Sequence, residues 1–137
     1  MLHSTLPTVK PLQGSVPLYL NFTTNYNDTG IAAGVKLLRV NASTKKPVLL
    51  RVRAEVVTAF NAATTNVLTI GTDAASANQI LGAADITEGT PGFYPSTGNI
   101  GYLRLIADTD VYVKYTQTGT AATTGVANLY LEFMPLF

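Results

Sequence analysis

Residues 110–133 read DVYVKYTQTGTAATTGVANLYLEF, and this stretch decides the fold class. Apolar and polar residues alternate on both sides of a centre rich in Thr and Gly. A hydropathy period of two residues is typical of a β-strand with one buried face. The side chains predicted to face inward are Val111, Val113, Tyr115, Ala127, Leu129, Leu131 and Phe133. The intervening TGTAATTG, residues 118–125, predicts a hairpin loop between two strands.

The same alternation recurs earlier, in PVLLRVRAEVV at residues 47–57. Here the pattern predicts two faces. The inward set is Val48, Leu50, Val52, Ala54 and Val56, and the outward set is Leu49, Arg51, Arg53 and Glu55. Shorter candidate strands are PLYLNF at 17–22, GVKLLRV at 34–40 and GYLRLIA at 101–107.

Residues 56–71, VVTAFNAATTNVLTIG, predict the end of one strand, a turn at NAATT and the next strand. Gly71 allows the chain to bend as it leaves the sheet. A phosphate-binding loop needs a glycine-rich turn, a helix start and usually a lysine, and the GTDAAS segment that follows has one glycine and no lysine. Residues 73–85 could form one helical turn, capped by Thr72 or Asp73. The irregular stretch 82–99 predicts a long surface loop.

These patterns together predict an all-β protein, an antiparallel β-sandwich of about seven or eight strands. Jelly-roll topology is one arrangement that fits. The predicted organisation is an extended N-terminal arm at 1–17, a sandwich domain at 18–133 and an apolar C-terminal tail at 134–137.

The composition favours a protein that works in an assembly. Hydrophobic residues make up 47% of the chain and charged residues 12%, against roughly 25% charged in an ordinary soluble domain. Thr, Asn and Ser must supply most of the polar surface; a monomer with a Thr-rich exterior is the alternative. Without any Cys, disulfides and thiolate metal sites are excluded. No apolar run suits a membrane span or a signal peptide.

The charges divide unevenly along the chain. Before residue 54 there are seven basic residues and one acidic residue, a net +6, and from residue 54 onward two basic and seven acidic, a net −5. Such polarity could orient docking on a partner. Alternatively, the two halves mix in space and cancel. Nucleic acid is not a predicted partner, because the basic half lacks interleaved aromatic residues.

Catalytic groups are scarce. The single His is His3, in the proline-punctuated arm, where it could not be held rigidly in a triad. Asp108 and Asp110 could ligate Ca²⁺ with a loop carbonyl, although a solvated turn is the more common role of such a pair. Asp85 and Glu88 have no placeable partner for a glycosidase pair. The sequence therefore predicts no enzyme, no cofactor and no metal.

The termini and loops supply the predicted contacts with other subunits. Prolines keep the N-terminal arm extended, and the chain ends LEFMPLF, apolar to its last residue. Either both ends latch onto neighbours or they fold back over the domain's own core. The candidate contact residues are Met134, Leu136, Phe137, Lys45, Lys46, Phe93 and Tyr94.

The segments VVTAFNAATTNVLTIGT and DVYVKYTQTGTAATTGVANLYLEF, the Thr/Asn/Ala-rich surface and the lack of Cys resemble small β-sandwich head decoration (cement) proteins of tailed bacteriophages. The likeness spans residues 48–133. It implies a non-enzymatic virion protein on the phage head that binds the major capsid protein after expansion, often as a homotrimer. Neither nucleic acid nor membrane is an expected partner. The alternative function is a tail or fibre module that attaches to host glycans through exposed Tyr and the 82–99 loop.

Overall fold

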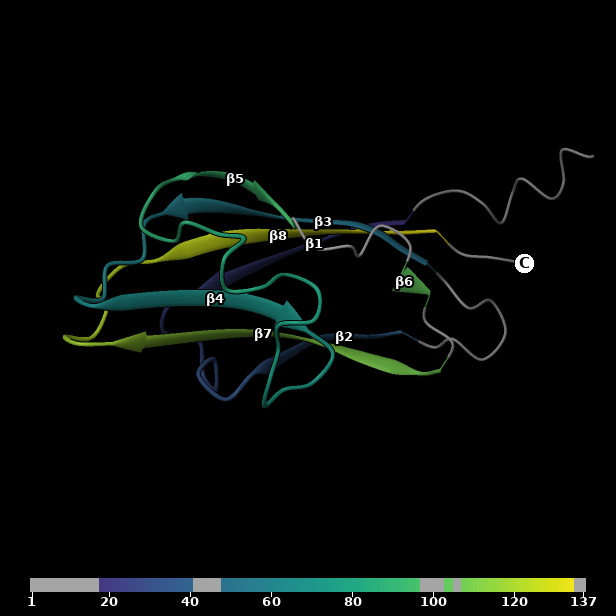
Figure 1. Cartoon of the computed structure of the whole chain (residues 1–137), viewed down its shortest axis with the longest axis horizontal. Coiled ribbons are helices and arrows are strands. Elements are labelled where there is room, and N and C mark those ends of the chain that lie inside the picture. The colour runs from purple at the N-terminus through teal and green to yellow at the C-terminus, as the bar shows by residue number, and fades with distance from the viewer. Residues whose placement is uncertain (1–17, 41–47, 97–102, 105–106, 135–137) are drawn as a thin grey trace, which may run out of the picture.

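The computed structural model describes residues 18–40, 48–96, 103–104 and 107–134. Eight strands form two antiparallel sheets packed face to face, which confirms the predicted β-sandwich (Figure 1). The strands are β1 (Leu18–Asn25), β2 (Val35–Val40), β3 (Val48–Thr58), β4 (Thr65–Gly71), β5 (Gly92–Pro95), β6 (Leu103–Arg104), β7 (Thr109–Thr118) and β8 (Val126–Met134). In these ranges no helix is long and apolar enough to cross a membrane.

The chain passes repeatedly from one sheet to the other. The five-stranded sheet has the order β1-β8-β3-β5, with β6 also paired to β3, and the three-stranded sheet has the order β2-β7-β4. The predicted hairpin at residues 118–125 is therefore wrong, because β7 and β8 belong to different sheets. Face-packed sheets lie about 10 Å apart, so the loop that joins these strands spans the thickness of the sandwich.

The alternation in β7 and β8 is confirmed: their predicted inward side chains are all buried. The prediction for β3 is wrong at Leu49, which is fully buried. The register shifts between Leu49 and Arg51, and the extra residue of such a bulge reverses the faces on one side of it. Val52, Ala54 and Val56 then point inward as predicted.

Residues 73–85 do not form the predicted helical turn. The Asp73 side chain accepts a hydrogen bond from the Ala75 N–H at 3.0 Å, which stabilises a turn instead. Ile70 then pairs with Leu81 as an isolated bridge. The predicted loop at 82–99 is interrupted by β5, which pairs with β3.

The core is anchored where two crossing loops meet. Phe60, in the loop from β3 to β4, packs its ring against Tyr115 of β7 at a centroid distance of 4.8 Å. Gly125, in the loop from β7 to β8, lies directly against the same ring, and a Cβ there would overlap with Phe60. The tight approach of the second loop to the core thus requires glycine at this position.

Hydrogen bonds from Asn61 hold these two loops together. Its Nδ2 donates to Thr123 Oγ1 at 2.9 Å. Its Oδ1 accepts from the N–H groups of Thr123 and Thr124 at 2.8 and 3.0 Å. Since one side chain satisfies two backbone donors, the loops are fixed to each other without regular strand pairing.

A buried carboxylate closes the exposed edge of β4. Glu88 is 6% exposed, and its Oε1 accepts a hydrogen bond from the Leu68 N–H at 2.7 Å. Its own carbonyl accepts from Phe60 N–H at 2.9 Å. Burial raises the pKa of Glu88 above the usual value of 4.5, although the backbone hydrogen bonds oppose this shift. Glu88 therefore connects the edge of one sheet to the loop that carries Phe60.

We expect Gly125→Ala to lower the free energy of unfolding by about 2 kcal/mol or more, because it overpacks the core and strains a backbone with φ of 151°. Gly89→Ala is the matched control, since no atom lies within 4 Å of a Cβ built there. Urea unfolding of both variants measures the difference. Equal midpoints would contradict the role assigned to Gly125.

The Glu88 carboxyl predicts a pH dependence of stability. Its folded pKa lies above its unfolded pKa, so the folded state binds more protons in the window between them. The free energy of unfolding should therefore fall as pH rises from about 4.5 through the folded pKa. Glu88→Gln should remove this part of the slope and keep an acceptor for Leu68 N–H.

Glu88→Ala should lower the free energy of unfolding by about 1–3 kcal/mol near neutral pH, because it leaves the buried Leu68 N–H without an acceptor. Denaturation of the three proteins at several pH values checks both expectations. The same slope in wild type and Glu88→Gln would contradict the expected pH dependence, and equal stability of wild type and Glu88→Ala would contradict the role of the hydrogen bond.

Candidate contact surface

The solvent side of the five-stranded sheet gathers aromatic and charged side chains from four strands. We call this surface the outer sheet face and define it by Tyr19, Asn21, Arg51, Arg53, Glu55, Phe93, Tyr130 and Glu132. The register places Glu132 of β8 between Tyr19 and Arg51, and Tyr130 between Asn21 and Arg53. Glu55 lies opposite Phe93 of β5. The alternation that buries the core residues therefore presents these side chains together on the other side.

Glu55 is the centre of a polar network on the outer sheet face. Its Oε1 accepts from the Tyr130 hydroxyl at 2.7 Å and from Asn128 Nδ2 at 3.2 Å. The hydrogen bond to the Glu55 carboxylate raises the pKa of Tyr130, with burial and the negative charge adding to the shift. The Tyr130 ring also lies 6.4 Å from the ring of Phe93. Tyr130 is therefore held in place from two sides.

Glu132 organises the neighbouring row. It forms an ion pair with Arg51, Nε to Oε1 at 3.9 Å. A hydrogen bond to the same carboxylate, together with its charge, raises the pKa of Tyr19. Tyr19 nevertheless remains 68% exposed. It therefore offers an apolar ring to a partner while its hydroxyl is oriented by the sheet.

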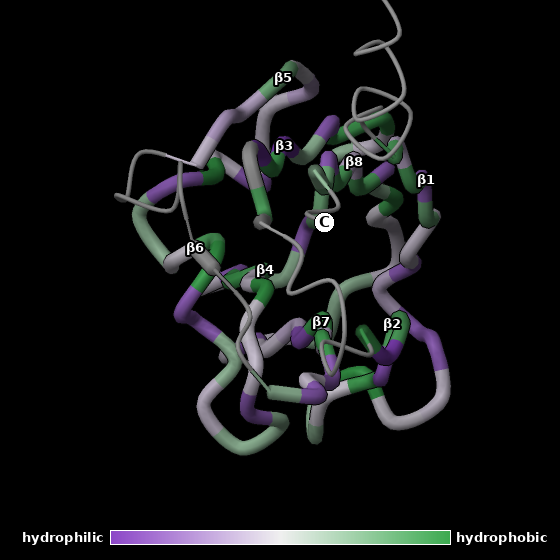
Figure 2. The backbone as a smooth tube through the Cα atoms, turned by 90° about the vertical axis from the view of Figure 1, so that its right-hand side faces the viewer, coloured by the Kyte–Doolittle hydropathy of each residue, from purple (hydrophilic) through white to green (hydrophobic). Residues whose placement is uncertain are grey.

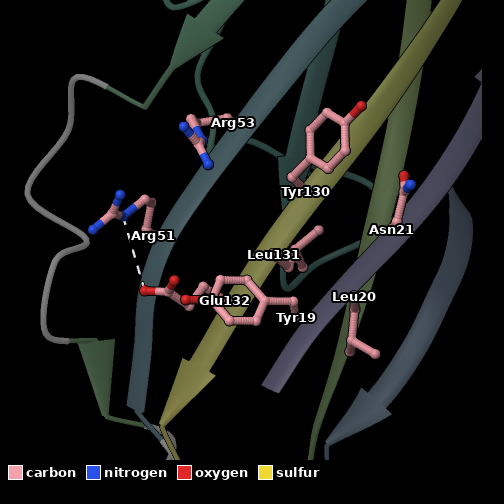
Figure 3. Close-up of a pocket in the computed structure, with 8 residues that line it drawn as sticks. All are labelled: Tyr19, Leu20, Asn21, Arg51, Arg53, Tyr130, Leu131 and Glu132. Carbon is pink, nitrogen blue, oxygen red and sulfur yellow. Dashed lines mark ion pairs between the residues drawn. The ribbon is translucent and has the colours of Figure 1, made fainter. Parts of the chain in front are cut away.

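A shallow hollow of about 110 Å³ opens between these side chains (Figure 3). Tyr19, Tyr130 and the two arginines surround it, and Leu20 and Leu131 contribute to its lining. The arginines extend from β3 along one side, and the tyrosines lie on β1 and β8. The hollow can receive a protruding side chain or a small polar group, but it is too small to enclose a drug-sized ligand.

The predicted contact residues have different environments. Phe93 is 64% exposed on the outer sheet face. Its neighbour Tyr94 points the other way, packs against the core and donates its hydroxyl proton to the Thr90 carbonyl at 2.7 Å. Met134 is the last residue of β8 and pairs with Val48. Lys45, Lys46, Leu136 and Phe137 lie outside the described residues, as does His3.

Asp108 and Asp110 are used in ion pairs. Arg39 NH1 lies 3.1 Å from Asp110 Oδ1, and Arg39 NH2 lies 3.6 Å from Asp108 Oδ2. Lys36 adds a second, longer contact of 4.0 Å to Asp110. Over the described ranges, no three His, Cys, Asp or Glu side chains gather in a possible metal site.

These ion pairs also show how the charges of the basic first half and the acidic second half of the chain are arranged in space. Each joins a basic residue of the first half to an acidic residue of the second, because β2 pairs with β7 and β3 with β8. For these charges, the alternative that the two halves mix in space holds.

Sequence reasoning predicted that Arg51, Arg53 and Glu55 would face outward, but not that they would lie beside Tyr130 and Tyr19. Alternation assigns a face to each residue without specifying which strands are neighbours. The signal for Tyr19 was present in the alternating LYLNF of β1. Only the order β1-β8-β3 unites these residues in one surface.

No protein-family model matches the chain, and no curated protein matches it. Three solved structures of phage capsids contain a similar fold. A chain of the cyanophage Pam1 capsid asymmetric unit aligns with a TM-score of 0.65 at 20% identity, over 88% of this chain and 86% of that chain. A chain in the acid-stable capsid of Helicobacter pylori bacteriophage KHP30 gives 0.62 at 14% identity, over 88% of both chains. A chain in the capsid of Ralstonia phage GP4 gives 0.60 at 18% identity, over 87% and 84%. The chain thus has the fold of chains found in phage capsid structures.

Proposed function

We propose that this protein is a non-enzymatic structural component of a phage virion, located in the capsid. The observation that carries the proposal is the likeness in fold to chains from three phage capsids, each covering at least 87% of this chain. Likeness over nearly the whole chain supports a shared architecture, not a common small motif. The low proportion of charged residues, 12%, also suits a protein that buries much of its surface in an assembly.

Within the capsid, we propose the role of a head decoration protein that binds the major capsid protein and associates with itself as a homotrimer. Many copies that bind the mature lattice but not its precursor would stabilise the mature state by mass action. The strand order supports a jelly-roll description, since the chain alternates between sheets and β1 lies beside β8. That topology is common in viral capsid proteins.

The outer sheet face is the proposed contact with the capsid. It presents two large exposed side chains, Tyr19 and Phe93, and Tyr19 lines a hollow flanked by arginines. Tyr and Arg are enriched among residues that dominate binding energy at protein interfaces. The Glu55 and Glu132 networks orient the tyrosines before binding, which lowers the entropy lost on association.

Immunogold electron microscopy of purified particles, with an antibody against this chain, tests the location. We expect label distributed over the head. Label confined to the tail would contradict the decoration role and favour attachment to host glycans. Absence of label from every particle would contradict the virion proposal itself.

Tyr19→Ser combined with Phe93→Ser should reduce the number of copies on each head at limiting protein by about tenfold or more, since loss of an interface anchor costs upward of 1–2 kcal/mol. Tyr112→Ser, on the outer side of the three-stranded sheet, is the matched control. Copies per particle are measured by quantitative mass spectrometry against the major capsid protein, after thermal melting confirms that each variant is folded. Equal occupancy by all variants would contradict this contact face.

A further inference from the structure

Three of the four lateral edges of the sandwich carry features that discourage the addition of another strand. The edge of β4 is covered by the Ile70–Leu81 bridge and by the Glu88 carboxylate. The register of β2 shifts between Lys36 and Leu38, and this strand carries two charges. β5 has four residues and ends at a proline. Bulges, charges, proline, short length and covering segments are the usual means by which proteins protect sheet edges.

Within the described ranges, the edge formed by β1 lacks this protection before Asn25. Its eight residues, LYLNFTTN, include no charge, proline or glycine. Its pairing with β8 is continuous from Leu18 to Asn25. In the described part of the chain β1 pairs with β8 alone, at the margin of the sheet (Figure 2). At the end of β1, the N–H and carbonyl of Asn25 bond to Asp28. Among the described residues, the outward backbone groups that a further strand could use are therefore those before Asn25.

The side chains of β1 also indicate that a neighbour is missing. Leu20 and Phe22 point toward the core but are only partly buried. Their register partners in β8, Leu131 and Leu129, are 1% and 0% exposed. The inward side of β1 is therefore half covered, and an added strand with apolar side chains on one face would complete its burial.

Residues 1–17 have a sequence that suits this role. Their prolines are Pro7, Pro11 and Pro17, all at odd positions. In an extended strand, residues of equal parity direct their backbone groups to the same side. The even residues would therefore form an unbroken ladder on one side, and the prolines would block the other, as in an edge strand. The even positions also carry Leu2, Leu6, Leu12 and Val16, which would share one face with Ser4, Thr8, Lys10 and Gly14.

We propose that residues 6–16 of one copy pair with the β1 edge of a second copy, and so add a strand to its five-stranded sheet. The prolines would face away from β1, and Leu6, Leu12 and Val16 would cover Leu20 and Phe22. A partner of this kind is recognised mainly by backbone hydrogen bonds, with apolar side chains setting the register. The inference deepens the proposed function in naming how copies associate, and it rests on that function for bringing many copies together.

The position of Pro17 favours pairing between copies over pairing within one copy. It immediately precedes β1, lacks the N–H needed to close a hairpin ladder, and biases Val16 toward extended geometry. The arm would thus leave the start of β1 in an extended direction. Seventeen extended residues reach at most about 55–60 Å, which is sufficient to contact an adjacent subunit.

Two proline variants of the full-length chain test this inference. Thr8→Pro removes an N–H on the side predicted to pair with β1, whereas Val9→Pro places the proline on the side already blocked. Thr8→Val controls for loss of the hydroxyl group. All three changes lie outside the described strands, and thermal melting checks that the sandwich is intact.

Amide hydrogen exchange by NMR, at low and high protein concentration, provides the measurement. In the wild type and in Val9→Pro, we expect β1 amides that point away from β8 to exchange at least about tenfold more slowly at high concentration. Thr8→Pro should lose this protection, and Thr8→Val should retain it. Mixed labelled and unlabelled copies should show contacts between the arm of one and β1 of the other.

Three outcomes would overturn the proposal. Protection of the β1 amides that is equal at both concentrations and is lost in Thr8→Pro would mean that the arm pairs within its own copy. Protection that rises with concentration and is unchanged in every arm variant would mean that another segment occupies the edge. No protection would mean that the edge stays open. Label on the head in any of these cases would leave the proposed capsid location standing.

Discussion

The contact of Phe60 with Tyr115 and Gly125 is the constraint on which the sandwich depends. Two loops cross between the sheets at the same end, and both must bring the chain across a packed core. Phe60 fills the space beneath them, and the missing side chain at Gly125 allows the second loop to lie against its ring. Asn61 then joins the loops by satisfying backbone donors. The packing of one aromatic side chain, Phe60, therefore helps to fix where β4 and β8 begin.

From this anchored end the strands define two kinds of surface. Core positions allow little change in volume, because buried side chains such as Leu129 and Val52 are enclosed on all sides. The outward positions of the same strands carry no such restriction. Tyr19, Arg51 and Tyr130 thus lie on a rigid support whose geometry is maintained by the core side chains on the opposite face of the sheet. A rigid support of this kind suits a protein that must dock in many identical copies.

Alternation alone predicted most strands and the buried faces of β7 and β8. It failed where the regular period was interrupted: the bulge near Leu49 changed the parity, and nothing in PVLLRVRAEVV marks it. It also failed at residues 118–125, because a turn-rich loop between alternating strands has the same composition whether it closes a hairpin or crosses to another sheet. The contact surface depends on the order of strands, which arises from long-range packing. Arg51 and Tyr130 are 79 positions apart, and no local pattern relates them.

The unprotected edge of β1 has a consequence for how far association can proceed. An open edge normally invites repeated addition, since each new strand exposes another ladder. A strand whose prolines all face away from β1 would not pair with a further strand, so each sheet would gain one strand only. Each copy would then donate one arm and receive one, and this directional exchange ends only when the copies close a ring. Copy number would be set by the angle between neighbours, not by the strength of the contact.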